Sequence, residues 1–401
     1  MLKQAVVLVG GLGTRLGDRT RSVPKPLLEV AGKPFLDYIL DELSRYPAIE
    51  SILLLAGHRA EQVVDRYEGR RWRGASVAVV SEPAQLGTGG ALKHAASRLA
   101  GKFFMLNGDS FFDFNLLDLA AQAANSPAIV HMALKRDQPG DRYGRVLLDG
   151  ATVKEFLPAG SQPNGPINSG VYCVDREVLS LIDEVPCSLE QRVFPMLVER
   201  GQLSAAVYDG FFIDIGIPSD FERVQSELPA TVRRRAVFFD RDGVLNIDKA
   251  YVHRIEDFEW VAGAREAIKL CNDRGYLVFV VTNQAGVARG YYGVDAVHRL
   301  HDWMNEELAA IGAHIEEFQY CPDHEDGVVE QFRRASNRRK PAPGMILDCL
   351  EGWPVRKEGS LLVGDKPHDL EAAAAAGIPG HLFEGGDLAA FIRPLLGTGV
   401  R

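Results

Sequence analysis

Two series of short apolar segments, separated by one polar stretch, run along this chain. The first series includes AVVLV, SILLLAG, SVAVVSE and FFMLNGD, and longer segments of helical pattern lie between its members. The second series consists of AVFFD, YLVFVVT and LLVGD, and each of these segments ends in a residue that can bind phosphate or metal. Such alternation predicts mostly parallel sheets with helices on both faces and ligand sites at the carboxyl ends of the strands. We therefore expect an α/β protein with two doubly wound domains.

The polar stretch SELPATVRRRA between the two series predicts a domain boundary. It contains Pro229 and three consecutive arginines. A chain of 401 residues also exceeds the length at which a single hydrophobic core stops growing. We predict a first domain over residues 1–225, a linker over 226–235 and a second domain over 236–401. The alternative for 226–235 is a helix end followed by a surface loop.

Composition excludes several classes of partner. The net charge of -9 argues against nucleic acid as a partner, because a protein needs a basic face to bind the phosphate backbone. No apolar run approaches the roughly 18 residues that span a bilayer, and MLKQAVVLVGG leads straight into a strand, so we expect neither a membrane segment nor a signal peptide. The five cysteines are odd in number and include no C-x-x-C pair, which is typical of a reducing compartment. We expect a cytoplasmic protein, and the sequence leaves its oligomeric state open.

A glycine-rich loop, GGLGTRL, follows the first apolar segment. Its candidate nucleotide-binding residues are Gly10, Gly11, Gly13, Thr14 and Arg15. Glycines allow backbone N–H groups to approach phosphate closely. The loop is not the dinucleotide fingerprint, because Leu16 stands where a small residue is needed, and it lacks the G-K-[ST] of a Walker loop. With Lys25 in the following PKP segment, the two cations and the loop suit a triphosphate.

Two aspartates from separate strand ends complete the candidate site of the first domain. Asp109 ends the segment LNGD, and Asp214 lies in FIDIGIPSDF. A lone aspartate at a strand end is more often a helix cap or turn residue. Two such carboxylates can hold Mg²⁺ against the phosphates of a nucleotide.

These motifs, together with LGTGGAL, resemble the sugar-1-phosphate nucleotidyltransferase family over residues 1–225. EPAQLGTGGAL, INSGVYCV and FIDIGIPSDFERV are most similar to the D-glycero-α-D-manno-heptose 1-phosphate guanylyltransferases. The resemblance implies a Rossmann-like domain that binds GTP. It also implies in-line attack by a sugar-phosphate oxygen on the α-phosphorus, with pyrophosphate as the leaving group and no covalent intermediate.

The resemblance also implies roles for individual residues. Arg15 and Lys25 would act catalytically by neutralising the triphosphate. The segment Gly87, Thr88, Gly89 and Gly90 would pass close to the base and sugar, where side chains would block the fit. Asp109 would contact the nucleotide, Asp109 and Asp214 would hold Mg²⁺, and Glu190 and Asn168 would contact the sugar.

The chain departs from the family directly after the predicted strand that ends in Glu155 and Phe156. The family commonly has a lysine there that binds the sugar phosphate, whereas EFLPAG places Pro158 and Ala159 at these positions. Arg142 and Lys154 are the candidates to replace that lysine.

The second series opens with FFDRDGVLN, in which Asp240 and Asp242 follow a buried strand. Gly243 permits a turn that brings both side chains to one site. One carboxylate can attack phosphorus to give an aspartyl-phosphate, while the other protonates the leaving oxygen and later activates water. Three further candidates for this site follow at later segments, Thr282, Lys340 and Asp365.

This order of motifs resembles the haloacid-dehalogenase phosphatases. Residues 236–385, with AYVHRIEDFEWVAG, TNQAGVARGYY and RRKPAPGM, resemble the D-glycero-D-manno-heptose 1,7-bisphosphate 7-phosphatases and the related histidinol phosphatases. The resemblance implies a Rossmannoid domain with a minimal cap. It also implies Mg²⁺ bound by Asp240, Asp365 and a backbone carbonyl near Asp242. Phosphate would be bound by Thr282, Asn283 and Lys340, and a second phosphate of the substrate by Arg339.

Relatives of the second domain often carry a structural zinc, but this chain lacks the ligands for one. In CPDHEDGVVEQFRRASNRRKP only Cys321 remains, while Asp323, Ser336 and Arg338 occupy the other ligand positions. His324 lies beside the expected histidine position. One cysteine and one histidine do not make the four ligands of a structural zinc site. We expect no zinc.

The leading hypothesis is a bifunctional enzyme of GDP-heptose synthesis, whose partners are GTP and heptose phosphates. Its second domain would remove the 7-phosphate, and its first would then transfer GMP to C1 in the α-configuration. One alternative is a hexose (mannose-like) 1-phosphate nucleotidyltransferase fused to a phosphatase of other specificity. Another is a non-catalytic sugar-nucleotide sensor. Each domain has its own strand-end carboxylates, so we expect the two activities to be independent.

Overall fold

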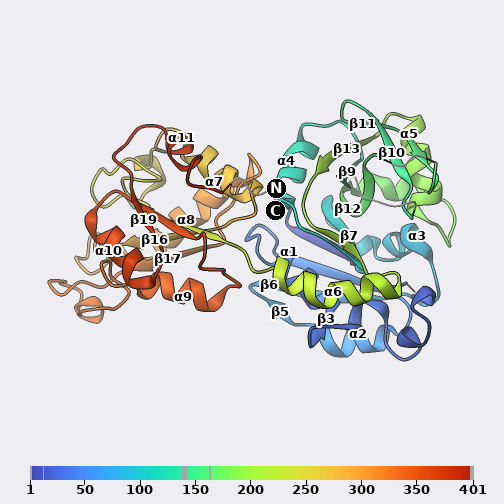
Figure 1. Cartoon of the computed structure of the whole chain (residues 1–401), viewed down its shortest axis with the longest axis horizontal. Helices are drawn as coiled ribbons and strands as arrows, with labels where there is room; N and C mark the ends of the chain where they lie inside the picture. The colour runs from blue at the N-terminus through green and yellow to red at the C-terminus, as the bar shows by residue number, and fades with distance from the viewer. Residues whose placement is uncertain (1, 12, 137–141, 162–163, 398–401) are drawn as a thin grey trace. The chain divides into compact units, whose positions relative to one another are not determined.

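The computed structural model describes residues 2–11, 13–136, 142–161 and 164–397. The chain divides into two compact units, unit 1 over Met1–Ala230 and unit 2 over Thr231–Val400 (Figure 1). The boundary falls inside the segment 226–235, for which the sequence predicts a linker. The local structure there is that of the alternative, because helix α6 (Pro218–Thr231) extends through the first part of this segment and buries Leu228.

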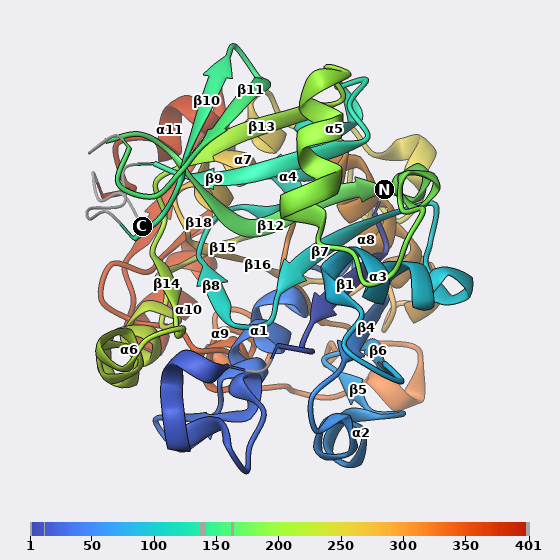
Figure 2. The same cartoon turned by 90° about the vertical axis from the view of Figure 1, so that its right-hand side faces the viewer.

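A ten-stranded sheet forms the centre of unit 1 (Figure 2). In spatial order its strands are β10 (Arg145–Asp149), β11 (Thr152–Leu157), β13 (Leu203–Tyr208), β9 (Val130–Lys135), β12 (Ile167–Asp175), β7 (Lys102–Asn107), β1 (Gln4–Leu8), β4 (Ser51–Ala56), β6 (Ala75–Ser81) and β5 (Arg71–Trp72). Strands β6, β4, β1 and β7 are parallel to one another. Strand β1 comes first of these in the sequence, and in the sheet it lies between β4 and β7. The strand order reverses there, and such a switch point opens a crevice at the carboxyl ends of the strands.

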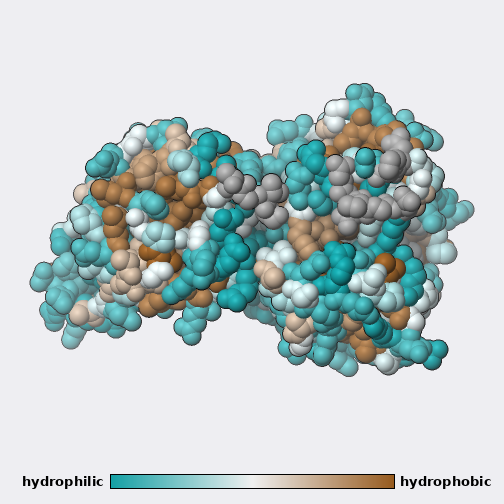
Figure 3. All heavy atoms as spheres, in the orientation of Figure 1, coloured by the Kyte–Doolittle hydropathy of each residue, from teal (hydrophilic) through white to brown (hydrophobic). Residues whose placement is uncertain are grey.

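Six α-helices of unit 1 occur among its described residues. They are α1 (Phe35–Leu43), α2 (Ala60–Tyr67), α3 (Gly87–His94), α4 (Leu116–Ala124), α5 (Phe194–Glu199) and α6. Short turns, η1 (Thr14–Thr20) and η2 (Lys25–Leu27), follow the glycine loop, and the π-helical turn η5 (Leu189–Val193) precedes α5. The outward face of α6 is hydrophilic (Figure 3), while Val224 and Leu228 are buried on its other side.

Two short elements of unit 1 bring distant residues together. Strand β8 (Ser110–Phe112) pairs in antiparallel fashion with β14 (Phe212–Asp214), and the register sets Asp214 opposite Ser110. Asp109 and Asp214, which are more than a hundred residues apart in the sequence, are therefore neighbours. A second small ladder joins β2 (Glu29–Val30) to β3 (Lys33–Pro34).

Unit 2 is built on a five-stranded, fully parallel sheet. Its spatial order is β17 (Glu317–Cys321), β16 (Leu277–Asn283), β15 (Ala236–Phe239), β18 (Leu361–Gly364) and β19 (Gly380–Leu382). Alternate residues of β15 enter two separate cores, with Val237 and Phe239 on one face and Ala236 and Phe238 on the other. This period of two is expected for a strand buried on both faces.

Helices cover both faces of this sheet. The core with Val237 also includes residues of α7 (Ala264–Asp273), α8 (Val294–Ala309) and α11 (Leu388–Ile392), and the core with Phe238 includes residues of α9 (Gly344–Gly352) and α10 (Pro367–Ala376). Between β15 and α7 the chain forms loops and the short turn η6 (Ile255–Asp257), in agreement with the predicted minimal cap. In the ranges that the structure describes, no helix has both the length and the apolar character needed to cross a membrane.

Candidate active sites

A cavity of about 270 Å³ lies in unit 1 where β1 and β7 end. Its lining includes Gly10, Gly11, Lys25, Glu82, Gly87, Thr88, Asn107 and Asp109. The glycine loop and Asp109 thus meet at the switch point of the sheet, as the sequence predicts. Gly13 adopts a left-handed conformation (φ 64°), which suits glycine at the start of η1.

The side chain of Lys25 links the two carboxylates of this site. Its Nζ lies 2.6 Å from Asp109 Oδ2 and 3.3 Å from Asp214 Oδ1. The sequence associates Lys25 with a triphosphate, but in this structure its charge is shared by the two aspartates. Because both carboxylates face one cation, they lie close enough for a divalent ion to bridge them.

Arg142 and Arg15 extend the positive charge around Asp214. Arg142 Nη2 lies 2.7 Å from Asp214 Oδ2, and its other terminal nitrogen bonds to Asp220 at the start of α6. A side chain at Gly216 would stand 2.8 Å from Arg142 Nη2 and 3.3 Å from Arg15 Nη2. Burial, and then the charge of Asp109, raise the pKa of Asp214, while Lys25 and Arg142 oppose that rise and so stabilise its ionised form.

The glycines of α3 pack against another segment of the protein. A Cβ at Gly87 would lie 2.4 Å from the carbonyl oxygen of Cys187, and one at Gly89 would lie 3.2 Å from Cys187 Sγ. Gly87 and Thr88 line the cavity, whereas Gly89 and Gly90 are buried. The missing side chains therefore make room for the protein's own 185–187 segment. The predicted approach of these glycines to the base and sugar stays a prediction.

Glu190 and Asn168 are bound to neighbouring protein groups. Glu190 Oε2 accepts a hydrogen bond from Thr88 Oγ1 at 2.8 Å, which connects η5 to α3. The amide of Asn168 donates to Tyr172 Oη at 2.8 Å, and burial raises the pKa of that phenol well above its ordinary value. Neither residue is part of the cavity lining given above, so their contact with a sugar stays a prediction.

Glu82 is a cavity residue that the sequence patterns did not single out. It follows β6, one carboxylate oxygen accepts a hydrogen bond from the backbone N–H of Leu86 at 3.2 Å, and the other borders Gly10. Burial raises the pKa of this carboxyl group. In the sequence, Glu82 could have been noticed only from its position at a strand end within EPAQLGTGG. A surface glutamate can occupy the same position, so this signal is not specific.

Unit 2 has a cavity of about 330 Å³ at the corresponding switch point, where β15 and β18 end. It is lined by Asp240, Asp242, Asp248, Ala250, Tyr251, Thr282, Asn283, Gln284, Ala285, Arg289, Tyr292, Arg339, Lys366 and His368. Five of the predicted site residues therefore lie around one cavity. Lys340 is buried directly behind Asp240.

A buried lysine also links two carboxylates in unit 2. Lys340 Nζ lies 2.9 Å from Asp240 Oδ1 and 2.7 Å from Asp369 Oδ1. Burial raises the pKa of Asp240 to about 6, and the charge of Lys340 opposes that rise. Burial lowers the pKa of Lys340, but Asp240 and Asp369 raise it by more, so the ammonium is retained.

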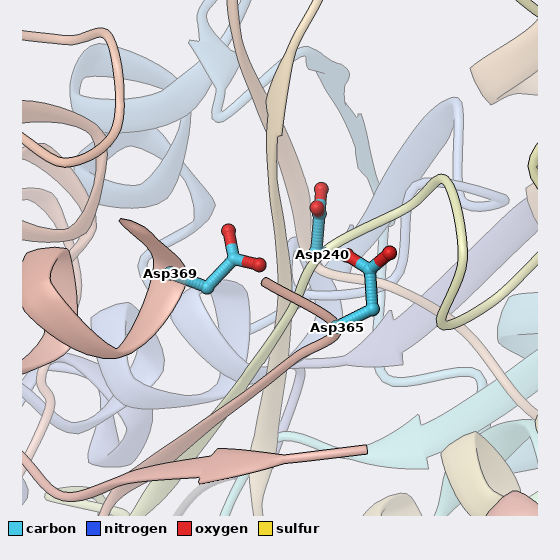
Figure 4. Close-up of side chains that lie close together, drawn as sticks. All are labelled: Asp240, Asp365 and Asp369. Carbon is cyan, nitrogen blue, oxygen red and sulfur yellow. The ribbon is translucent and has the colours of Figure 1, made fainter. Parts of the chain in front are cut away.

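Three aspartates of unit 2 could hold a metal ion. Oxygens of Asp240, Asp365 and Asp369 lie within 4.8 Å of one another, and the three side chains point toward a common space (Figure 4). Asp365 Oδ1 is buried without a hydrogen-bond donor in the described structure, which suits a metal-facing oxygen. The sequence predicts Asp240 and Asp365 here but misses Asp369, because an aspartate in the first turn of a helix ordinarily caps it.

The side chain of Asp242 is held by several donors. Arg241 Nη2 lies 3.0 and 2.9 Å from its two oxygens, Gln284 Nε2 lies 2.9 Å from Oδ2, and Asn246 Nδ2 lies 3.1 Å from Oδ1. Its side chain is thus outside the group of three aspartates. Gly243 adopts a φ of 91°, which supports the predicted turn, and a Cβ there would lie 2.3 Å from Asp365 Oδ2.

The remaining predicted residues of unit 2 hold the strand ends in place. Asn283 exchanges two hydrogen bonds with the backbone of Lys340, at 3.1 and 3.0 Å, and Thr282 Oγ1 accepts one from Gln284 at 2.9 Å. Arg339 donates to the carbonyl of Asp323 at 3.4 Å.

The 321–341 segment, in which the sequence predicts no zinc site, forms contacts within unit 2. Asp323 pairs with Arg334 at 3.1 Å, and Arg338 bonds to Asp348 on α9. The absence of zinc stays a prediction, because metal content is a chemical measurement.

Comparison with known proteins gives independent matches for both units. Residues 4–231 match the family described as nucleotidyl transferase, and residues 337–390 match one described as HAD-hydrolase-like. A D-glycero-β-D-manno-heptose-1,7-bisphosphate 7-phosphatase of Rhodopseudomonas palustris is 48% identical over 164 residues, which are 41% of this chain and 91% of that protein. A D-glycero-α-D-manno-heptose-1,7-bisphosphate 7-phosphatase of Burkholderia mallei is 44% identical over 147 residues, which are 37% and 78% of the two chains.

One solved structure resembles unit 1 in particular. The crystal structure of HddC from Yersinia pseudotuberculosis complexed with GMP-PN is 29% identical, with a TM-score of 0.50. The match covers 57% of this chain and 100% of that one.

Proposed function

Since the chain belongs to the nucleotidyl transferase family over residues 4–231 and to the heptose-bisphosphate phosphatases over its second unit, we propose that it carries out two steps of GDP-heptose synthesis. Unit 2 removes the 7-phosphate of D-glycero-D-manno-heptose 1,7-bisphosphate. Unit 1 then transfers GMP from GTP to the heptose 1-phosphate. The observation that carries the proposal is the presence, in one chain, of two complete acidic sites at the switch points of two sheets.

The phosphatase step uses Asp240 as nucleophile. Its carboxylate attacks phosphorus to form an aspartyl-phosphate, and Lys340 at 2.9 Å favours the ionised form that this attack requires. Asp242, oriented by Arg241 and Gln284, protonates the leaving sugar oxygen and then takes a proton from the water that releases phosphate.

The transferase step needs no protein nucleophile. A phosphate oxygen of the sugar attacks the α-phosphorus of GTP, and pyrophosphate leaves. Arg15 and Lys25 neutralise the charge that develops on the phosphates, and the glycine loop offers backbone N–H groups. Mg²⁺, which Asp109 and Asp214 would hold in unit 1 and Asp240, Asp365 and Asp369 in unit 2, supplies further positive charge at the phosphate oxygens when bound.

Glu82 supports guanine as the base. Guanine presents two adjacent donors, N1–H and the N2 amino group, whereas uracil, cytosine and adenine do not, so a carboxylate in the cavity favours guanine. The similarity to a structure complexed with GMP-PN points the same way. Glu82→Gln would replace one acceptor by a donor, and we expect GTP to lose its preference over UTP.

The order of the steps follows from charge. The unit 2 cavity already contains the groups proposed to bind the phosphate that is cleaved, and Arg339 adds a cation to it. This cation can bind a second phosphate, so unit 2 favours a bisphosphate. The 7-phosphate therefore leaves first. The α-anomer of the 1-phosphate is the proposed acceptor because the motifs of unit 1 resemble the D-glycero-α-D-manno-heptose 1-phosphate guanylyltransferases. The relatives of unit 2 include phosphatases named for the β-anomer and others named for the α-anomer, so the two anomers must be tested separately.

One incubation tests the proposal. The purified chain is supplied with each anomer of heptose 1,7-bisphosphate, GTP and Mg²⁺, and phosphate and pyrophosphate are followed separately. We expect phosphate to appear first and pyrophosphate to follow, with the α-anomer preferred. GDP-heptose 7-phosphate appearing before free phosphate would contradict the order, and faster turnover of the β-anomer would contradict the anomer. Mannose 1-phosphate as the better acceptor would support the hexose alternative.

A further inference from the structure

We propose that Arg142 binds the phosphate of the sugar 1-phosphate acceptor in unit 1. The inference deepens the proposed transferase function and rests on it. The sequence leaves two candidates for this task, Arg142 and Lys154. The contacts of the two side chains distinguish between them.

A further cation at the unit 1 site would lower the repulsion between the two substrates of the reaction. The acceptor phosphate must approach a triphosphate, and both are anionic at neutral pH. Lys25 is already bound to Asp109 and Asp214, and Arg15 and Lys25 together face the triphosphate in the proposed mechanism. An incoming dianion therefore needs a further positive group beside these carboxylates.

Arg142 meets this requirement. Its Nη2 lies 2.7 Å from Asp214, its other terminal nitrogen bonds to Asp220, and its guanidinium lies 5.0 Å from the centre of the Tyr143 ring. A guanidinium has five N–H donors, so two ion pairs leave others for an oxyanion. The side chain is about one-fifth exposed (22%), so it is accessible to a ligand. Two carboxylates and a ring fix its position before the substrate arrives, and this lowers the entropy cost of binding.

Lys154 does not meet it. This residue lies on β11, its side chain is 55% exposed, and its Nζ pairs with Asp149 of the adjoining strand at 3.4 Å. Other cations near Arg142 in the sequence have partners elsewhere, since Lys135 and Arg136 both bond to Asp209. Of these side chains, Arg142 alone has a described contact with Asp214.

A purely structural role is the competing explanation, because Arg142 also ties β14 to α6. Loss of that tie would disturb the position of Asp214 and would weaken the binding of GTP and of the acceptor alike. Loss of a phosphate contact would weaken the binding of the acceptor selectively. The two roles therefore differ in which substrate is affected.

The test uses the full chain with Arg142→Met and Arg142→Lys, and Lys154→Met as the matched control. The KM for heptose 1-phosphate and for GTP are measured by pyrophosphate release. Binding of GTP is measured alone, and it also reports whether unit 1 is folded. We expect Arg142→Met to raise the KM of the acceptor by about 10- to 100-fold and that of GTP by less than about threefold. Arg142→Lys should recover part of the loss, and Lys154→Met should change both by less than about twofold.

An equal rise in both KM values, or an unchanged acceptor KM, would overturn the inference. The same measurements with mannose 1-phosphate separate it from the proposed function, because the contact is to the phosphate that both sugars share. If heptose 1-phosphate is inactive with the wild type, the heptose assignment is refuted. If Arg142→Met then raises the KM of mannose 1-phosphate selectively, the role of Arg142 is kept.

Discussion

The two units solve a similar electrostatic problem with different degrees of burial. In each, a lysine links two aspartates near the switch point of the sheet. In unit 1 the side chain of Lys25 is 6% exposed, but those of Asp109 and Asp214 are 37% and 15% exposed. In unit 2 the side chains of Lys340, Asp240 and Asp369 are 1%, 8% and 0% exposed. The same ion-pair arrangement therefore lies in two different environments.

This difference matches the chemistry proposed for each site. A displacement between two substrates needs carboxylates that stay accessible to phosphates and their counter-ion, and unit 1 has them. A carboxylate that attacks phosphorus itself must be shielded from competing water and yet remain ionised. Burial raises the pKa of Asp240, so a permanent cation behind it is needed to offset that effect. We infer that burial of the carboxylates paired with the lysine distinguishes a site with a protein nucleophile from one without.

The largest expected effect tests whether the two sites are separate. Asp240→Asn removes the nucleophile, and we expect phosphate release to fall on the order of 10⁴-fold, with pyrophosphate release from heptose 1-phosphate and GTP unchanged within about twofold. Asp109→Ala should have the reverse effect, with pyrophosphate release lowered by about 10²- to 10³-fold. Loss of both reactions from either substitution in a folded protein would break the comparison.

Much of both sites follows from the sequence because parallel strands end at the same edge of a sheet. Gly10 and Asp109, and likewise Asp240 and Asp365, could be placed together on that ground alone. The contacts of Arg142 could not be predicted, since its pairing with Asp214 bridges 72 residues and depends on the path of loops. Asp369 escaped notice because its position in α10 is that of an ordinary first-turn aspartate.

The glycines of α3 illustrate a different limit of sequence reasoning. A run of glycines near a nucleotide suggests space for a ligand, but the sequence does not show which segment fills that space. In the structure the segment is the backbone of Cys187, which is about a hundred residues away along the chain. Packing between distant segments was thus the information that the sequence pattern lacked.

The two lysines provide a second test through stability. Lys340→Met would leave Asp240 and Asp369 buried without their cation, and we expect it to destabilise unit 2 by about 3–5 kcal/mol. Lys25→Met leaves Asp109, which is 37% exposed, and Asp214, which keeps its ion pair with Arg142, so we expect a loss of only about 1 kcal/mol in unit 1. Hydrogen exchange resolved along the chain measures each unit separately. Equal losses would contradict the assigned difference in burial.

Two glycines with positive φ should separate a packing role from a role in the site. In unit 1, Gly87→Ala places a methyl group against the backbone of Cys187 at φ 73°, and we expect a loss of about 2–4 kcal/mol in stability. In unit 2, Gly243→Ala meets the carboxylate of Asp365, which can move, so phosphate release should fall far more than stability. Gly69→Ala is the control, since it shares the positive φ but has open space around it, and it should cost about 1 kcal/mol.

The last expected effect is a loss of stability in acid, and it arises in the core of unit 1 and not in its site. His131 is buried on β9 with Nδ1 at 2.6 Å from Ser204 Oγ, and burial lowers its pKa to about 4. The unfolded chain binds a proton at this residue near pH 6.5, whereas the folded one does so only near pH 4, so stability is complete above about pH 6.5 and falls as the pH drops toward 4. At pH 5 the loss from this residue is about 2 kcal/mol. Urea unfolding of the wild type and His131→Phe at pH 7 and pH 5 measures it. The substitution should lower stability at pH 7 but reduce the further loss on acidification by about that amount, and an unchanged pH dependence would show that His131 is not the group responsible.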